Sequence, residues 1–190
     1  MPSIRHLVAA VALVAGAAAT PLAAQDAGTP AARFTLGGYL ANYWFDRGGS
    51  ADRASVGGYG VRLMFNRSTA SRVARTFFDR ASAGAFATLT TEQDGVSTQN
   101  IGGEVDVALF PTPIASGRLD PFIGLAAGIL RSDADAVGSS TDFALTPSIG
   151  TRIPFFSGIG FRGDIRTPIV FSDGDARVHP LIEGGIYISF

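Results

Sequence analysis

Apolar and polar residues alternate along most of the chain from residue 33 onward, in segments separated by clusters of Gly, Asp, Ser and Pro. A period of two sorts side chains to opposite faces of a sheet, so each segment predicts a β-strand. The eight segments cover residues 33–45, 55–66, 81–91, 99–110, 119–131, 142–153, 158–171 and 178–190. Each reaches the length of about 9–11 residues that a membrane-spanning strand needs. The pattern predicts an all-β chain with eight antiparallel strands.

The two faces of these strands differ in charge. The second, fourth, seventh and eighth segments sort most clearly, whereas both faces of the first and third carry apolar or small residues. The polar faces hold four arginines and four acids, which are Arg62, Arg152, Arg162, Arg166, Glu104, Asp106, Asp164 and Glu183. An eight-stranded barrel has an interior just wide enough for side chains, where buried charges must be paired. Equal numbers therefore favour an ion-paired, closed lumen inside a wall that faces lipid; in the alternative, the faces are inverted and the charges are solvated.

Aromatic residues lie near both predicted rims, as expected where a barrel wall meets lipid headgroups. One rim would hold Trp44, Tyr59, Phe143 and Phe171, and the other Phe65, Phe110, Phe155, Phe156 and Phe190. Aromatic residues also favour strands in general, so this distribution supports the membrane interpretation without deciding it.

The first residues predict export. Arg5 precedes an apolar run over residues 7–19, and small residues follow up to Ala24. This is the order of a secretory signal peptide, and the run is too short for a transmembrane helix, which needs about 20 residues. We therefore expect a signal peptide at 1–24, a leader at 25–32 and the barrel domain at 33–190.

Composition narrows the function classes. After removal of the signal peptide, 14 arginines face 16 acids and there is no lysine, so no electrostatic case exists for nucleic-acid binding. The chain has no cysteine, which excludes a disulfide framework. No second apolar stretch approaches helix-spanning length, so a membrane location requires a closed barrel.

Two segments carry a family resemblance. The final strand, IEGGIYISF (182–190), resembles the C-terminal signal of bacterial outer-membrane barrels, and LDPFIGLAAGIL (119–130) resembles their recurrent fifth strand. Together they resemble the OmpA/OmpX-like superfamily of small eight-stranded barrels. The resemblance implies a Gram-negative outer membrane, with lipid and lipopolysaccharide as neighbours and a monomeric state. It also implies that Tyr187 and Phe190 form an assembly signal for periplasmic chaperones and the barrel assembly machinery.

The connection between the second and third segments departs from that pattern. Residues 67–80 form a stretch longer than the short periplasmic turns of such barrels. It fits either a short amphipathic helix on the membrane surface or a plain loop.

The chain holds no recognisable catalytic constellation. His179 is the only histidine after the signal peptide, and no serine stands near it in a known motif. Glu183 shares its face but lies roughly 13 Å along the strand. The sequence therefore predicts no enzyme, no cofactor and no dedicated metal site; acids in the predicted external loops are expected to be solvated.

Three classes of function remain. The first is a structural or surface-interaction barrel in the cell envelope with a closed lumen, which the paired charges favour. The second is a narrow pore or a transport barrel for small molecules, which unpaired arginines would line. The third is a soluble periplasmic binding barrel of lipocalin type, which would need an apolar cavity.

Overall fold

The computed structural model describes residues 34–46, 53–66, 80–91, 96–134, 138–156, 158–172 and 175–190. The predicted signal peptide and leader lie outside the described residues, as does the 67–80 connection apart from Arg80. Within the described part of the chain, no helix is long and apolar enough to cross a membrane.

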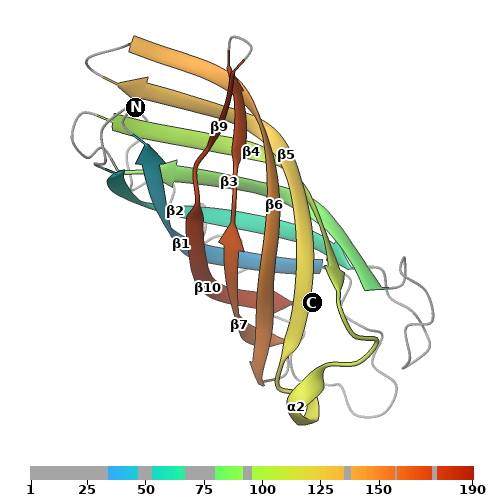
Figure 1. The fold of residues 1–190 in the computed structure, drawn as a ribbon. Helices are drawn as coiled ribbons and strands as arrows, with labels where there is room; N and C mark the ends of the chain where they lie inside the picture. The colour runs from blue at the N-terminus through green and yellow to red at the C-terminus, as the bar shows by residue number, and fades with distance from the viewer. Residues whose placement is uncertain are drawn as a thin grey trace.

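Ten strands form one closed antiparallel barrel (Figure 1). They are β1 (Phe34–Asp46), β2 (Arg53–Asn66), β3 (Ala81–Thr90), β4 (Val96–Ala108), β5 (Asp120–Ala134), β6 (Gly138–Phe156), β7 (Ile159–Arg166), β8 (Ile169–Ser172), β9 (Asp175–Val178) and β10 (Leu181–Ser189). Consecutive strands pair from β1 through β7, and β10 pairs with both β7 and β1. The backbone groups of Phe34 and Phe190 exchange two hydrogen bonds of 3.0 and 2.9 Å at this seam.

Two prolines divide the last two predicted strands. Strands β7 and β8 are separated at Pro168, and β9 and β10 at Pro180, because proline has no N–H to donate to a ladder. The register does not change across the break, since Arg166 lies opposite Leu181 and β8 still pairs with β9. The prediction of eight antiparallel strands is therefore confirmed, with two of them interrupted.

The stagger of the ladders fixes the strand tilt. A path that starts at Ile186 on β10 and steps from each residue to its paired neighbour passes once around the barrel and arrives at Ala176 on β9. Because β9 and β10 are parts of the same interrupted strand, one circuit displaces the position by ten residues. With about 3.3 Å per residue and about 4.8 Å between neighbouring strands, this stagger tilts eight strands by about 40°. Such a tilt is typical of small closed barrels.

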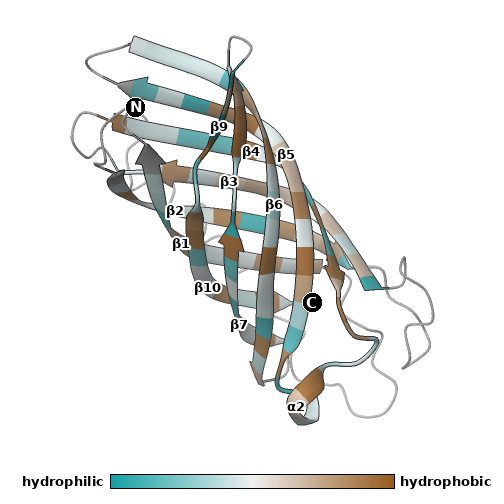
Figure 2. Cartoon of the chain, viewed as in Figure 1, coloured by the Kyte–Doolittle hydropathy of each residue, from teal (hydrophilic) through white to brown (hydrophobic). Residues whose placement is uncertain are grey.

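The barrel is apolar outside and charged inside. Alternate residues of each strand change from apolar to polar along the ribbon (Figure 2). Outward-facing Leu40, Ile129 and Ile165 are 72%, 57% and 56% exposed, whereas inward-facing Asp106 and Arg166 are 1% and 2% exposed. A soluble barrel has the opposite arrangement, so the inverted-face alternative is wrong and the wall suits hydrocarbon.

The strands run further than predicted at one end. Residues 132–134 and 138–141, which lie between two predicted strands, belong to β5 and β6, and residues 175–177, also between predicted strands, belong to β9. Alternation fails there because both faces of this end meet water: all four residues of β9 are exposed. At the other end, β4 and β5 are joined through the short turn α2 (Ile114–Gly117), in which Ala115 and Ser116 have φ of 52° and 58°.

A charge on the outer wall tests this assignment. Ile165 lies in a row with Ile149 and Ile182, which are 55% and 50% exposed. We expect Ile165→Arg to lower the free energy of unfolding in lipid vesicles by about 2–4 kcal/mol, because the guanidinium would face hydrocarbon. Urea titration of the folded fraction measures the change. Val107 has the outward parity of its strand, but it is only 8% exposed and is a poorer position for this test.

Ser139→Arg is the matched control, because Ser139 is exposed at the end of β6, in the β5–β6 hairpin. Its effect should stay within about 0.5 kcal/mol. Equal losses for the two variants would mean that the wall does not face lipid.

Candidate functional site

Charged side chains from six strands meet inside the barrel. They alternate with the outward apolar residues, so the period of two alone aims them at the lumen. Nine ion pairs connect the following residues into one group, called here the ion network: Asp120, Arg152, Asp106, Arg162, Asp164, Arg62, Glu104, Glu183 and Arg166. It runs from one barrel end toward the middle.

The network begins at the end of the barrel where the turn α2 lies. Arg152 of β6 contacts Asp120 at 3.0 Å and Asp106 at 3.1 Å. The same Asp106 oxygen, Oδ2, accepts from Arg162 at 2.6 Å, and Arg162 also donates to Asp164 at 2.6 Å. Asp106 and Asp164 each pair with two arginines, so each carboxylate is compensated although both are buried.

Arg62 is the central residue of the deeper part. Its guanidinium contacts Glu104, Glu183 at 2.6 Å and Asp164 at 3.6 Å. Arg166 then joins the same two glutamates, at 3.2 Å to Glu104 and 3.1 Å to Glu183. Two guanidiniums and two carboxylates thus alternate in space, which is the arrangement that low dielectric requires of buried charges.

Aromatic rings complete the packing around the arginines. The guanidinium carbon of Arg62 lies 4.7 Å from the centre of the Tyr39 ring, and that of Arg166 lies 4.8 Å from the Phe86 ring. The centre of the Phe122 ring lies 4.3 Å from the guanidinium carbon of Arg162 and 4.7 Å from that of Arg152. Each arginine therefore has a carboxylate and a ring as neighbours, and both contacts are strengthened by desolvation.

Glycine makes room for one of these rings. A Cβ added at Gly60 would lie 2.4 Å from Tyr39 Cζ and 2.6 Å from the Ala87 carbonyl oxygen. The Tyr39 ring thus lies across the bare backbone of β2, and its hydroxyl is 2.7 Å from Thr88 Oγ1.

Beyond the ion network, neutral side chains fill the lumen. Buried Tyr43, Thr88 and Asn100 lie on the inward faces of β1, β3 and β4. A cluster of Leu130, Ala144 and Val170 follows further along the strands. These residues are at most 4% exposed, so the interior changes from ionic to apolar along the barrel axis.

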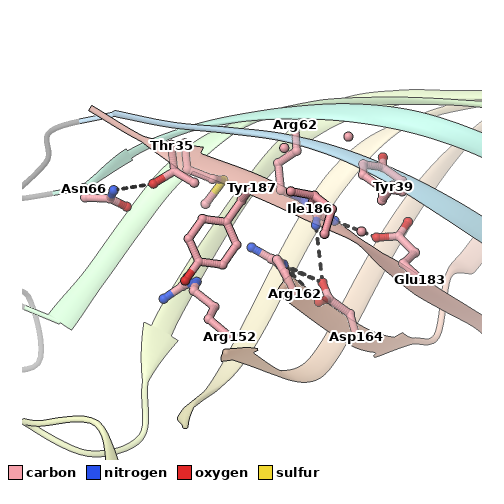
Figure 3. Close-up of a pocket in the computed structure, with 14 residues that line it drawn as sticks. Thr35, Tyr39, Arg62, Asn66, Arg152, Arg162, Asp164, Glu183, Ile186 and Tyr187 are labelled. Atoms are coloured by element: carbon pink, nitrogen blue, oxygen red, sulfur yellow. Dashed lines mark hydrogen bonds and ion pairs between the residues drawn. The ribbon is translucent and has the colours of Figure 1, made fainter. Parts of the chain in front are cut away.

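Two cavities lie at the ionic end. A cup of about 290 Å³ is lined by residues that include Arg80, Asp120, Arg152 and Tyr187. A deeper space of only about 30 Å³ is enclosed by residues including Arg62, Arg162 and Glu183, which converge on it in Figure 3. The smaller space suffices for about one water molecule. Solvent therefore enters from this end and meets the ion network.

The structure brings together all eight residues predicted to share the lumen. The sequence analysis did not assign Asp120 or the three rings Tyr39, Phe86 and Phe122 to the lumen. Tyr39 and Phe86 belong to the first and third segments, whose two faces could not be distinguished. Tyr187 lies in the lumen, where its ring covers Gly160, and Phe190 stacks on Phe34 with ring centres 6.1 Å apart. Their role as an assembly signal stays a prediction.

The chemistry of the remaining polar groups is limited. Among the described residues, no group of three or more His, Cys, Asp or Glu side chains is placed to hold a metal ion. His179 is 8% exposed, close to Pro168 of the neighbouring strand, whose carbonyl accepts from the His179 backbone N–H at 2.9 Å. The site offers paired charges in a filled interior.

Comparison with known proteins supports the fold. No protein-family model matches the sequence, and no curated protein matches it. Among solved structures, Neisserial surface protein A is similar with a TM-score of 0.63 and 12% identity, over 85% of this chain and 100% of that one. AlkL, an outer-membrane protein, has a TM-score of 0.48 and 12% identity over 88% and 94% of the two chains. Ail, the attachment invasion locus protein of Yersinia pestis, has a TM-score of 0.44 and 10% identity over 85% of this chain and 99% of that one.

Removal of the central cation tests the energetics of the ion network. Arg62→Met keeps most of the side-chain length but leaves Glu104 and Glu183 with Arg166 as their shared partner. We expect a loss of about 3–5 kcal/mol in the free energy of unfolding, because a buried carboxylate without compensation is strongly unfavourable. Urea unfolding in lipid vesicles measures it.

Two further variants separate charge from packing. Arg131→Met removes an arginine that is 55% exposed and paired with Asp133 at 3.4 Å, and it should change stability by less than about 0.5 kcal/mol. Adding Glu104→Gln to Arg62→Met should restore part of the loss, because it removes the stranded charge. A double variant no more stable than Arg62→Met would show that lost packing, not charge, dominates.

Proposed function

We propose that this chain, whose fold is that of the small eight-stranded outer-membrane barrels, is an outer-membrane protein with a structural or surface-interaction role and a closed lumen. The observation that carries the proposal is the ion network, in which four arginines and five acids pair inside a wall that is apolar on its outside. Lipid and lipopolysaccharide would surround the monomer, and Tyr187 and Phe190 would be recognised by chaperones and the assembly machinery.

The way in which the interior is filled supports a closed lumen. A pore needs a continuous wet path, lined by charges that attract an ion without binding each other. Here Arg62 and Arg162 are 5% and 7% exposed, and each contacts at least two carboxylates. The space beside them holds about one water, which argues against transport as the main activity.

The far end of the barrel supports a surface role. Strand β6 has 19 residues, which corresponds to about 60 Å of strand and, at a tilt of about 40°, about 45 Å across the membrane. An apolar band is only about 25 Å tall. About half of the excess, or about 10 Å at this tilt, lies at Gly138–Thr141, where every residue is exposed and polar or glycine. Neisserial surface protein A, the structure with the TM-score of 0.63, is described as a surface protein, in agreement with this role.

The soluble binding barrel is disfavoured by the same pattern. A lipocalin-type interior would be apolar and hollow, whereas this lumen is ionic and packed. Exposed Leu40, Phe156 and Ile101, at 72%, 77% and 60%, would then face water. Such an apolar exterior is expected only in lipid or in an interface.

Conductance across a planar bilayer distinguishes the closed barrel from a pore. We expect the intact protein to stay at the bilayer baseline. Arg162→Ala should raise conductance or destabilise the barrel, because the truncation opens space for about two or three waters beside the now unpaired Asp106 and Asp164. Glu104→Ala should act in the same direction.

Arg177→Ala, on exposed β9, is the control and should leave both conductance and stability unchanged. Electrophoresis with and without boiling checks that each variant is a folded barrel, since a closed barrel changes mobility on heating. Steady ion current through the intact protein, or neutral results for both lumen variants, would argue for an open, wet lumen.

A further inference from the structure

The lipid-facing wall has a shallow hollow between β1 and β2, with a volume of about 570 Å³. Its outward-facing residues belong to two paired rows: Leu40 lies opposite Tyr59, and Asn42 lies opposite Gly57. Ser55 and Thr91 border the same hollow, on the side toward the end of the barrel with the long β5–β6 hairpin. None of the described residues that line it is charged.

The hollow exists because Gly57 interrupts a wall of larger side chains. A Cβ added at Gly57 meets no atom within 4 Å, so the space above it is open. Leu40, at 72% exposure, stands beside this space and forms one side of it. A flexible apolar chain that lay here would contact side chains on both flanks as well as the bare backbone at the bottom.

The polarity of the hollow changes along the strand direction. Leu40 and Tyr59 form the end nearer the middle of the barrel. Asn42, Ser55 and Thr91 form the end nearer the rim, where Ser55 Oγ donates to Asn42 Oδ1 at 2.7 Å and Thr91 Oγ1 donates to the Gly57 carbonyl at 3.0 Å. Because its oxygen accepts from Ser55, the Asn42 amide directs its two N–H donors to the opposite side.

We propose that this hollow holds one acyl chain of a lipid of the outer leaflet, with the chain's ester or amide carbonyl at Asn42. The proposal rests on the proposed function, because it requires the wall to lie in the membrane. The apolar end matches the methylenes, and the neutral donors match the carbonyl level of a lipid, just below the headgroup. A phosphate would call for arginine or lysine, and none is found among the described residues that line the hollow.

The expected preference is modest. Lipid chains are as apolar as leucine, so burial from one lipid environment into another brings no hydrophobic gain. Retention depends on dispersion contacts in the hollow and on one hydrogen bond. We therefore expect the site to be occupied about threefold more often than a random position on the wall.

The only tryptophan of the chain provides a direct readout. Trp44 is two residues beyond Asn42 on the same outward face, and it lies opposite Ser55. Bromine atoms on an acyl chain quench tryptophan fluorescence on contact. In vesicles with a small fraction of brominated-chain lipid, quenching of Trp44 should exceed the value for random contact, and a non-brominated lipid with the same headgroup should compete it away.

Two glycine variants provide the matched comparison. Gly57→Leu fills the hollow without touching the backbone and should return quenching to the random value. Gly38→Leu adds the same side chain on the same wall, also where a Cβ meets no atom within 4 Å, but outside the hollow, and should leave the excess unchanged. Asn42→Leu removes the amide N–H donor for the lipid carbonyl but keeps the apolar end, and it should reduce the excess quenching of Trp44.

The outcomes separate the two proposals. Quenching in proportion to the brominated fraction, or equal behaviour of Gly57→Leu and Gly38→Leu, would overturn the acyl-chain site while leaving the membrane barrel intact. No quenching in vesicles made only of brominated lipid would mean that Trp44 is not in contact with lipid, and the membrane location itself would fail.

Discussion

Pairing between guanidinium and carboxylate in a narrow, water-poor lumen is the constraint on which the rest of this barrel depends. An isolated charge there would be disfavoured by several kcal/mol, so each of Arg62, Arg162 and Arg166 contacts two or more acids. These contacts join strands that are far apart in sequence, such as Arg62 of β2 with Glu183 of β10. A slip of one residue in any ladder would turn an arginine toward lipid and leave its acids unpaired, so the ion network also specifies the register.

The aromatic rings explain how so many charges fit into so small a space. Eight strands staggered by ten residues enclose little volume, and nine long or branched charged side chains do not fill it evenly. Phe122, which contacts two guanidiniums, and Tyr39, which lies over Gly60, occupy the remaining space with rings whose faces attract cations. The same rings cover backbone that glycine leaves bare. Packing and electrostatics are thus satisfied by one set of contacts, and the small residual space beside Arg62 follows from it.

Sequence pattern was sufficient for the architecture because charge marks the inner face. Charged residues recur at every second position on two strands, as Glu104 and Asp106 on β4 and as Arg162, Asp164 and Arg166 on β7. This leaves one assignment of faces for these strands, and the structure confirms it. Where the inner face carries Tyr39 or Phe86, apolar residues occur on both sides and binary pattern alone is ambiguous. The ion-pair partners of each charged residue could not be predicted from the sequence for another reason. They depend on the stagger of ten residues around the barrel, which is a property of the closed barrel and not of any single strand. Strand ends were misjudged where β5 and β6 leave the membrane, because alternation ends once both faces meet water.

A filled lumen changes where interactions with other molecules must occur. When the interior is occupied by its own side chains, specificity is left to the outer wall and to the strands that extend past the membrane. The outer wall is not uniform: glycine at position 57 creates a hollow beside Leu40, with neutral polar groups at its rim-side end. The extended strands present the opposite chemistry, with Ser139, Ser140 and Thr141 all exposed. The ion network connects these two regions, because a chain of ion pairs runs from Arg62 of β2, the strand that borders the hollow, to Arg152 of β6, the strand that carries Ser139.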